Sequence, residues 1–350
     1  MALFDRYLMV DWSGASVPRL GRDSIWTCLL ESRRPPRLEN HPTREAATAA
    51  IRAIMLESVG AGRRLLAGFD FSFAYPAGFA TRLGLDGAPW LAIWRLLARE
   101  IVDGPRNDNN RFAVAAELNR RLGGEAFPFW GCPARQQCAT LAMRGRRPHG
   151  PGDIAERRLA ERMLKQVQPS WKLHYTGSVG GQTLVGIPRL QALRVDPELQ
   201  AVTRVWPFET GFVPLTQRRL DRIAVLITEI YPSLIPLPDG VAVKDARQVE
   251  AMARFLLQHD RTGDLGALFA APVDDAARTV IEREEGWIFG AGTYVKPAHL
   301  PSPSPPRGEG RGEGAAKRDN TRRQSSNRLP LTPTLSPEGR GRTPDRRPAR

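Results

Sequence analysis

The first part of the chain alternates apolar runs with polar breaks in a way that predicts a mixed sheet. Residues 6–10 form an apolar run that ends at Asp11, and the stretch SIWTCLL at 24–30 predicts a second strand. The turn between them is rich in Gly and Pro, as hairpin loops are. A short third strand is expected at 37–39.

A helix and a buried strand follow. Thr43 is a good N-cap for a helix whose Ala and Ile residues recur at helical spacing until Gly60 and Gly62. The run LLAGFDF then predicts a buried fourth strand that ends at Asp70. The order strand, strand, strand, helix, strand predicts that the first and fourth strands are parallel neighbours.

The pattern in the rest of the chain predicts more helices than strands. A Gly-rich segment at 176–188 is expected to be a loop that leads into a strand. Helices are expected at 90–101, 111–121, 154–167, 245–258 and 274–284, and strands at 202–206, 211–214 and 222–232.

These elements predict one α/β domain over residues 1–295, in which 90–215 is a helical insertion. From 296 to 350 the composition shifts to Pro, Gly, Ser and Arg, which cannot bury enough apolar surface to order the chain. The segments 301–314 and 329–342 also look like translations of opposite strands of one DNA repeat. We therefore interpret this tail as disordered and as a captured repeat; the alternative is an Arg-rich arm that binds nucleic acid.

Composition narrows the class of protein. The net charge is +14, but residues 301–350 hold twelve Lys and Arg against five Asp and Glu, so half of the excess is in the tail. The remaining 39 basic and 32 acidic residues are compatible with a polyanionic substrate without requiring one. Three loosely spaced cysteines predict free thiols and a cytoplasmic location, and neither a membrane span nor a secretory leader is expected.

The candidate functional site consists of four carboxylates. Three of them come at the end of apolar runs, and the fourth lies at the start of a predicted helix. Asp11 and Asp70 end parallel neighbouring strands, so both are expected at the same edge of the sheet, where open α/β sheets place their sites. Glu229 ends the strand AVLIT, and Asp245 opens a late helix. Converging carboxylates predict a site for Mg²⁺ or Mn²⁺ at which a phosphoryl group is attacked.

Each of these residues also has a structural interpretation. Asp11 can hydrogen-bond the turn at Ser13 and Gly14, and Asp70 can cap the turn that follows it. Glu229 can be a buried structural group, and Asp245 can be a helix N-cap.

Several of these segments together resemble a family of uncharacterised bacterial and archaeal proteins described as predicted nucleases with an RNase H-like fold. The similar segments are VDWSGA at 10–15, GFDFSFAYP at 68–76, EIYPS at 229–233, KDARQVEAMA at 244–253 and EEGWIFG at 284–290. The resemblance is weakest over 90–215. It implies an RNase H-like mixed sheet flanked by helices.

The resemblance also implies that Asp11, Asp70 and Asp245 bind the metal, with Glu229 beside them to position or activate water. Asp245 and Glu250 are the alternatives for the last ligand. The expected activity is metal-dependent hydrolysis of phosphodiester bonds in a nucleic acid or nucleotide. The alternatives are a nucleotide-dependent phosphotransferase of actin-like type and a non-catalytic binding or regulatory protein on the same fold.

Other motifs carry weaker signals. The GSVGG segment at 177–181 lacks the Lys of a P-loop, although its backbone N–H groups can contact a phosphate. The polar run at 106–111 is interpreted as a solvated helix start, and the basic run RGRRPHG at 144–150 as ordinary surface. Trp12 follows Asp11 and is expected to form a wall of the site.

Overall fold

A six-stranded mixed sheet forms the centre of the computed structural model, which describes residues 2–145, 147–164, 166–237 and 243–293. The strand order is β3-β2-β1-β4-β6-β5. β2 is antiparallel to both of its neighbours, β1 and β3, whereas β4, β6 and β5 run parallel to β1. The strands are β1 Arg6–Asp11, β2 Ile25–Glu31, β3 Arg37–His41, β4 Leu65–Phe69, β5 Thr203–Val205 and β6 Val225–Glu229.

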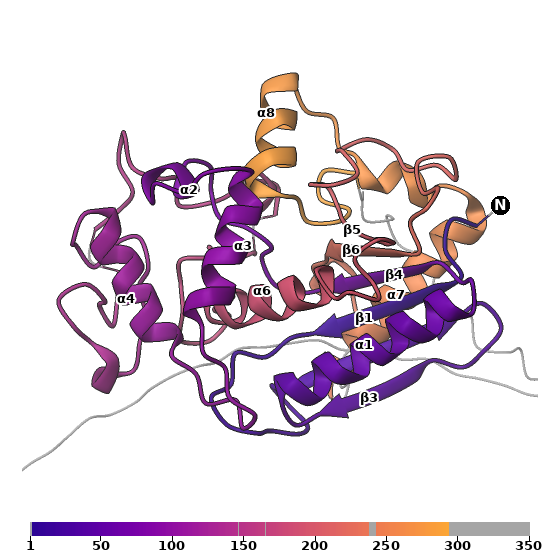
Figure 1. Cartoon of the computed structure of the whole chain (residues 1–350), viewed down its shortest axis with the longest axis horizontal. Helices are drawn as coiled ribbons and strands as arrows, with labels where there is room; N and C mark the ends of the chain where they lie inside the picture. The colour runs from indigo at the N-terminus through magenta and orange to yellow at the C-terminus, as the bar shows by residue number, and fades with distance from the viewer. Residues whose placement is uncertain (1, 146, 165, 238–242, 294–350) are drawn as a thin grey trace, which may run out of the picture. The chain divides into compact units, whose positions relative to one another are not determined.

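The predicted parallel pairing of the first and fourth strands is confirmed, with Val10 opposite Phe69. The central strands β4 and β6 are buried along their whole length. They are continuous apolar runs because helices cover both faces of the sheet. Figure 1 shows α1 in front of the sheet and α7 behind it.

Alternate residues of the strands supply two separate cores. Leu8 and Val10 of β1 pack with α1, whereas Tyr7 and Met9 pack with α7 on the opposite face. Thr43 accepts a hydrogen bond from Ala46 N at 3.1 Å and so caps α1, as predicted. The helices of four or more residues are α1 Arg44–Gly60, α2 Phe79–Arg82, α3 Pro89–Glu100, α4 Arg111–Leu122, α5 Leu159–Met163, α6 Gly180–Arg194, α7 Lys244–Thr262 and α8 Asp275–Val280.

Three predictions about the middle of the chain are wrong. The Gly-rich segment does not lead into a strand but begins α6. The predicted helix at 154–167 is helical only over Leu159–Met163, and 211–214 forms no strand. The helices predicted at 90–101, 111–121 and 245–258 are confirmed as α3, α4 and α7.

The described residues belong to one compact unit, and within them no helix is long and apolar enough to cross a membrane. Cys28, Cys132 and Cys138 are free thiols, as predicted. The predicted tail at 296–350 lies outside the described residues.

Candidate functional site

Asp11 and Asp70 meet where β1 and β4 end. Asp11 is the last residue of β1, and Asp70 directly follows β4, where its N–H donates to Val10 O at 3.2 Å. The Asp70 carboxylate reaches across to β1 and accepts a hydrogen bond from Trp12 N at 2.8 Å. Asp70 therefore does not cap the turn that follows it, which was the structural alternative.

The two carboxyl groups interact strongly with each other. Burial raises the pKa of Asp11 well above its ordinary value, and the Asp70 charge and a hydrogen bond between the two side chains add to this. Burial likewise raises the pKa of Asp70 to about 7. Two adjacent carboxylates in such surroundings share a proton, since ionising both is unfavourable.

Asp245 adds a third negative charge from the start of α7. It raises the pKa of both Asp11 and Asp70, so its carboxylate is close enough to act on them. Its Oδ2 accepts a hydrogen bond from Asp23 N at 2.8 Å, which ties α7 to the loop between β1 and β2. The helix N-cap is Val243, so Asp245 is not the capping residue.

The side chains of this cluster are of the kind that binds a divalent cation, but they are not arranged as a complete set of ligands. The largest influences on the pKa of Asp11 and Asp70 are burial and other carboxyl groups, and no basic side chain is among them. Only oxygen donors are present, as Mg²⁺ and Mn²⁺ prefer. Across the described ranges, however, no three His, Cys, Asp or Glu side chains are arranged to hold a metal ion.

Glu229 is engaged elsewhere. Both of its oxygens pair with the guanidinium of Arg158, at 2.6 and 2.8 Å, and it also accepts from Phe73 N at 2.9 Å. Arg158 is completely buried and also binds Glu161 at 2.8 Å. These contacts favour the structural interpretation of Glu229 over a role in activating water.

Glu250 is likewise occupied. It pairs with Arg247 at 2.7 Å and with Arg254 at 2.8 Å, and these bonds lower its pKa. A carboxylate held by two guanidinium groups is a poor metal ligand. Of the two alternatives for the last ligand, Asp245 is the one that lies with Asp11 and Asp70.

A cavity of about 430 Å³ opens beside Asp70. Lys172, Ser178 and Gln182 contribute to its lining, and so does Glu229. The Gln182 side chain donates to Trp12 O, which fixes the start of α6 against the loop that follows Asp11. The cavity thus offers an ammonium group, a hydroxyl and an amide next to the aspartate pair.

Two buried arginines were not among the residues singled out in the sequence. Arg158 holds Glu229, and Arg44 donates to Ser13 O and Ala15 O, which fixes the loop after Asp11. Arg44 also pairs with Asp103, which binds Arg189 as well. The Glu229 partner of Arg158, and the Ser13, Ala15 and Asp103 partners of Arg44, are far away along the chain, so no local pattern could have revealed these contacts.

Two other sequence interpretations need correction. The run at 106–111 is not simply solvated, because Asn107 is buried and accepts a hydrogen bond from Arg44 N at 2.9 Å. Trp12 is a core residue that packs against Phe69 and Phe71 and does not line the cavity beside Asp70.

Comparison with known proteins gives no match. No family model, curated protein or solved structure matches the chain.

Proposed function

We propose that this protein hydrolyses phosphodiester bonds of a nucleic acid or nucleotide with the help of Mg²⁺ or Mn²⁺. The observation that carries the proposal is the Asp11–Asp70 pair at the carboxyl end of two parallel strands. Burial raises the pKa of both groups, and repulsion by the Asp70 charge raises that of Asp11 further. A divalent cation would relieve that repulsion by replacing the shared proton. Perturbed acidic groups beside a cavity are typical of functional sites.

Asp11 and Asp70 would hold the cation, and Asp245 would complete its coordination from α7. The cation would supply charge stabilisation for the phosphoryl oxygens under attack. Lys172 and Gln182 line the adjoining cavity and would contact the phosphate or sugar of a substrate. Glu229 and Arg158 would keep the wall of that cavity rigid.

The second candidate is a binding protein without catalysis. It is favoured by one observation, that the described carboxylates form no ready three-ligand group. In that case the aspartate pair would shape the fold and the cavity would bind a ligand unchanged.

Metal binding distinguishes the two candidates. Binding to the folded state alone adds about 2.7 kcal/mol of stability at a hundredfold excess over Kd. We expect Mn²⁺ to raise the melting temperature of the wild type and to leave that of Asp11→Asn nearly unchanged. Thermal unfolding with Mn²⁺ and with EDTA measures this.

Asp86→Asn is the matched control, because Asp86 is exposed on the loop between α2 and α3. This variant should respond to Mn²⁺ as the wild type does. Hydrolysis of a phosphodiester substrate in Mn²⁺ should be lost in Asp11→Asn and kept in Asp86→Asn. A wild type that shows neither a metal response nor hydrolysis would leave the binding protein as the better proposal.

A further inference from the structure

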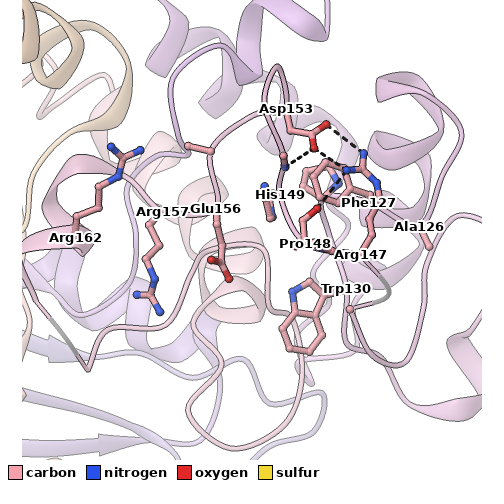
Figure 2. Close-up of a pocket in the computed structure, with 14 residues that line it drawn as sticks. Ala126, Phe127, Trp130, Arg147, Pro148, His149, Asp153, Glu156, Arg157 and Arg162 are labelled. Atoms are coloured by element: carbon pink, nitrogen blue, oxygen red, sulfur yellow. Dashed lines mark hydrogen bonds and ion pairs between the residues drawn. The ribbon is translucent and has the colours of Figure 1, made fainter.

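A second and larger cavity lies away from the aspartates. Its volume is about 790 Å³, and it is lined by parts of 126–130, 145–157 and Arg162 (Figure 2). The basic run at 144–150, interpreted from the sequence as ordinary surface, forms part of its wall. None of Asp11, Asp70, Asp245 and Glu229 contributes to it.

One wall of this cavity is an available aromatic surface. Trp130 is only partly buried, and a Cβ added at Gly145 would already lie 3.5 Å from its indole Cδ2. Glycine at this position therefore keeps side-chain atoms off the ring. The neighbouring Phe127 is already covered, by the Arg147 guanidinium at 3.7 Å and by His149 at 4.5 Å between ring centroids.

The cationic groups of the cavity fall into two kinds. Arg147 is neutralised inside the wall by Asp153 at 2.6 Å and Glu125 at 3.0 Å, as the dashed lines to Asp153 in Figure 2 indicate. Arg162 is exposed, and Figure 2 shows no interaction between it and the other residues drawn. Arg157 uses one guanidinium nitrogen to bind Val167 O, so the others remain for a ligand.

We propose that this cavity binds a nucleotide unit, with the base stacked on Trp130 and the phosphate held by Arg157. The Arg162 guanidinium points away from these two residues in Figure 2 and is left out of the proposed contact. Stacking on an aromatic side chain combined with a nearby cationic group is how proteins bind unpaired bases. Guanidinium groups suit phosphate because they donate two parallel hydrogen bonds to it. Figure 2 shows Trp130, Glu156 and Arg157 extending to the same side of the cavity, where Glu156 is an acceptor for a base or ribose donor.

Residues of this cavity are hydrogen-bonded to residues of, or next to, the cavity beside Asp70. Arg157 of this cavity binds the carbonyl of Val167, which lines the cavity beside Asp70. Trp130 N likewise donates to Trp171 O at 3.0 Å, next to Lys172 of the other cavity. The binding proposed here does not require the aspartates to be catalytic.

The test is equilibrium binding of the full chain in EDTA, at near-physiological salt. The probes are a short fluorescent single-stranded oligonucleotide of mixed sequence and, as competitor, AMP. We expect Trp130→Ala to weaken binding about tenfold, which is the lower part of the range for base stacking. Arg157→Gln should weaken it about fivefold by removing a phosphate contact.

Arg33→Gln is the matched control, because Arg33 is exposed on the turn between β2 and β3 and carries the same charge change. It should bind within about twofold of the wild type. Arg157 is only partly buried, so its variant tests the proposal even where Trp130→Ala fails to fold. Competition by AMP would identify a free nucleotide as sufficient, and binding of the oligonucleotide alone would identify a strand. No binding of either probe, or equal losses in Arg157→Gln and Arg33→Gln, would overturn the proposal.

Discussion

The Asp70 carboxylate accepts a stabilising hydrogen bond and is also repelled by a neighbouring negative charge. Its Oδ1 accepts from Trp12 N, which stabilises the end of β1. Burial and the charge of Asp245 oppose its ionisation and raise its pKa. One interaction thus stabilises the Asp70 carboxylate while others destabilise its charge. Unfavourable arrangements of this kind are expected at functional sites.

The raised pKa of Asp70 predicts how the stability of the protein depends on pH. The pKa of Asp70 is about 7 in the folded protein against an ordinary 3.8, so between these values the folded state holds more protons than the unfolded one. The free energy of unfolding in EDTA should therefore fall as the pH rises through this window, and stay low above it. Denaturant titration of the wild type at about pH 5 and about pH 8 measures the fall.

Asp70→Asn should flatten this pH dependence and stabilise the metal-free protein at about pH 8 by about 1–2 kcal/mol. The amide oxygen of Asn can still accept from Trp12 N. Asp86→Asn should keep the slope of the wild type. If Asp70→Asn is the less stable protein at both pH values, the hydrogen bond matters more than the repulsion.

The second prediction concerns the buried Arg158. Arg158→Met would leave Glu229 and Glu161 as buried carboxylates without a cation, so we expect a loss of about 3–5 kcal/mol of stability. Arg247→Met is the control, because Arg247 is 59% exposed in its pair with Glu250 and should cost less than about 1 kcal/mol. Urea denaturation compares them, and similar losses in both variants would show that Arg158 is not a core element of the fold.

Among the elements, α6 shows how packing overrides local preference. Its sequence, GGQTLVGIPRLQALR, holds three glycines and an internal proline, which is why the segment reads as a loop. The helix forms because ten of its residues are buried against the rest of the domain. Its glycines allow close approach: a Cβ at Gly186 would lie 2.5 Å from the Phe71 ring.

Gly180 gives the prediction for this element. A Cβ there would lie 2.2 Å from Ser170 O, a backbone atom that cannot easily move. Gly180→Ala should therefore destabilise the protein by about 1–3 kcal/mol despite the better helix propensity of Ala. Gly60→Ala at the end of α1 meets nothing within 4 Å and should be neutral or slightly stabilising. Thermal unfolding of the two variants tests this, and equal melting temperatures would contradict it.

In α6 a predicted loop is a helix, whereas around Arg158 most of a predicted helix is not helical. The apolar spacing at 154–167 predicts a helix, but Arg158 is extended, with φ −64° and ψ 161°, and α5 begins only after it. This backbone carries the guanidinium into the core, where Glu229 and Glu161 bind it. A distant ion pair thus decides where the helix starts.

In the whole molecule, the strand order places the ends of β1 and β4 side by side and brings the start of α7 to the same edge. The loops at that edge are fixed by buried arginines rather than by apolar contacts alone. This arrangement explains how acidic groups from three distant parts of the chain affect one another.

The prediction for the whole molecule concerns the tail. Truncation after about Leu300 removes a segment whose composition cannot support a core, so the melting temperature should stay within about 2 °C of the full chain. Calorimetry of the full and shortened chains measures this. A larger drop would show that the tail packs on the domain.

The sequence by itself determined the first four strands, the helix between the third and the fourth, and the pairing of the first strand with the fourth. The apolar runs and the Thr43 cap were enough to predict β1 to β4, α1 and the parallel pairing, because short-range periodicity reports which faces are buried. That pairing also predicted that Asp11 and Asp70 meet. Asp245 was found through its place at the start of a periodic helix.

Only the tertiary structure decided the rest. Glu229 looks like the other acids in the sequence, yet Arg158 neutralises it, and Glu250 is held by two further arginines. The glycines of α6 look like a loop until their close packing is seen. The physical reason is the same in each case: the partner of a buried charge or of a close backbone contact lies far along the chain, where no local pattern records it.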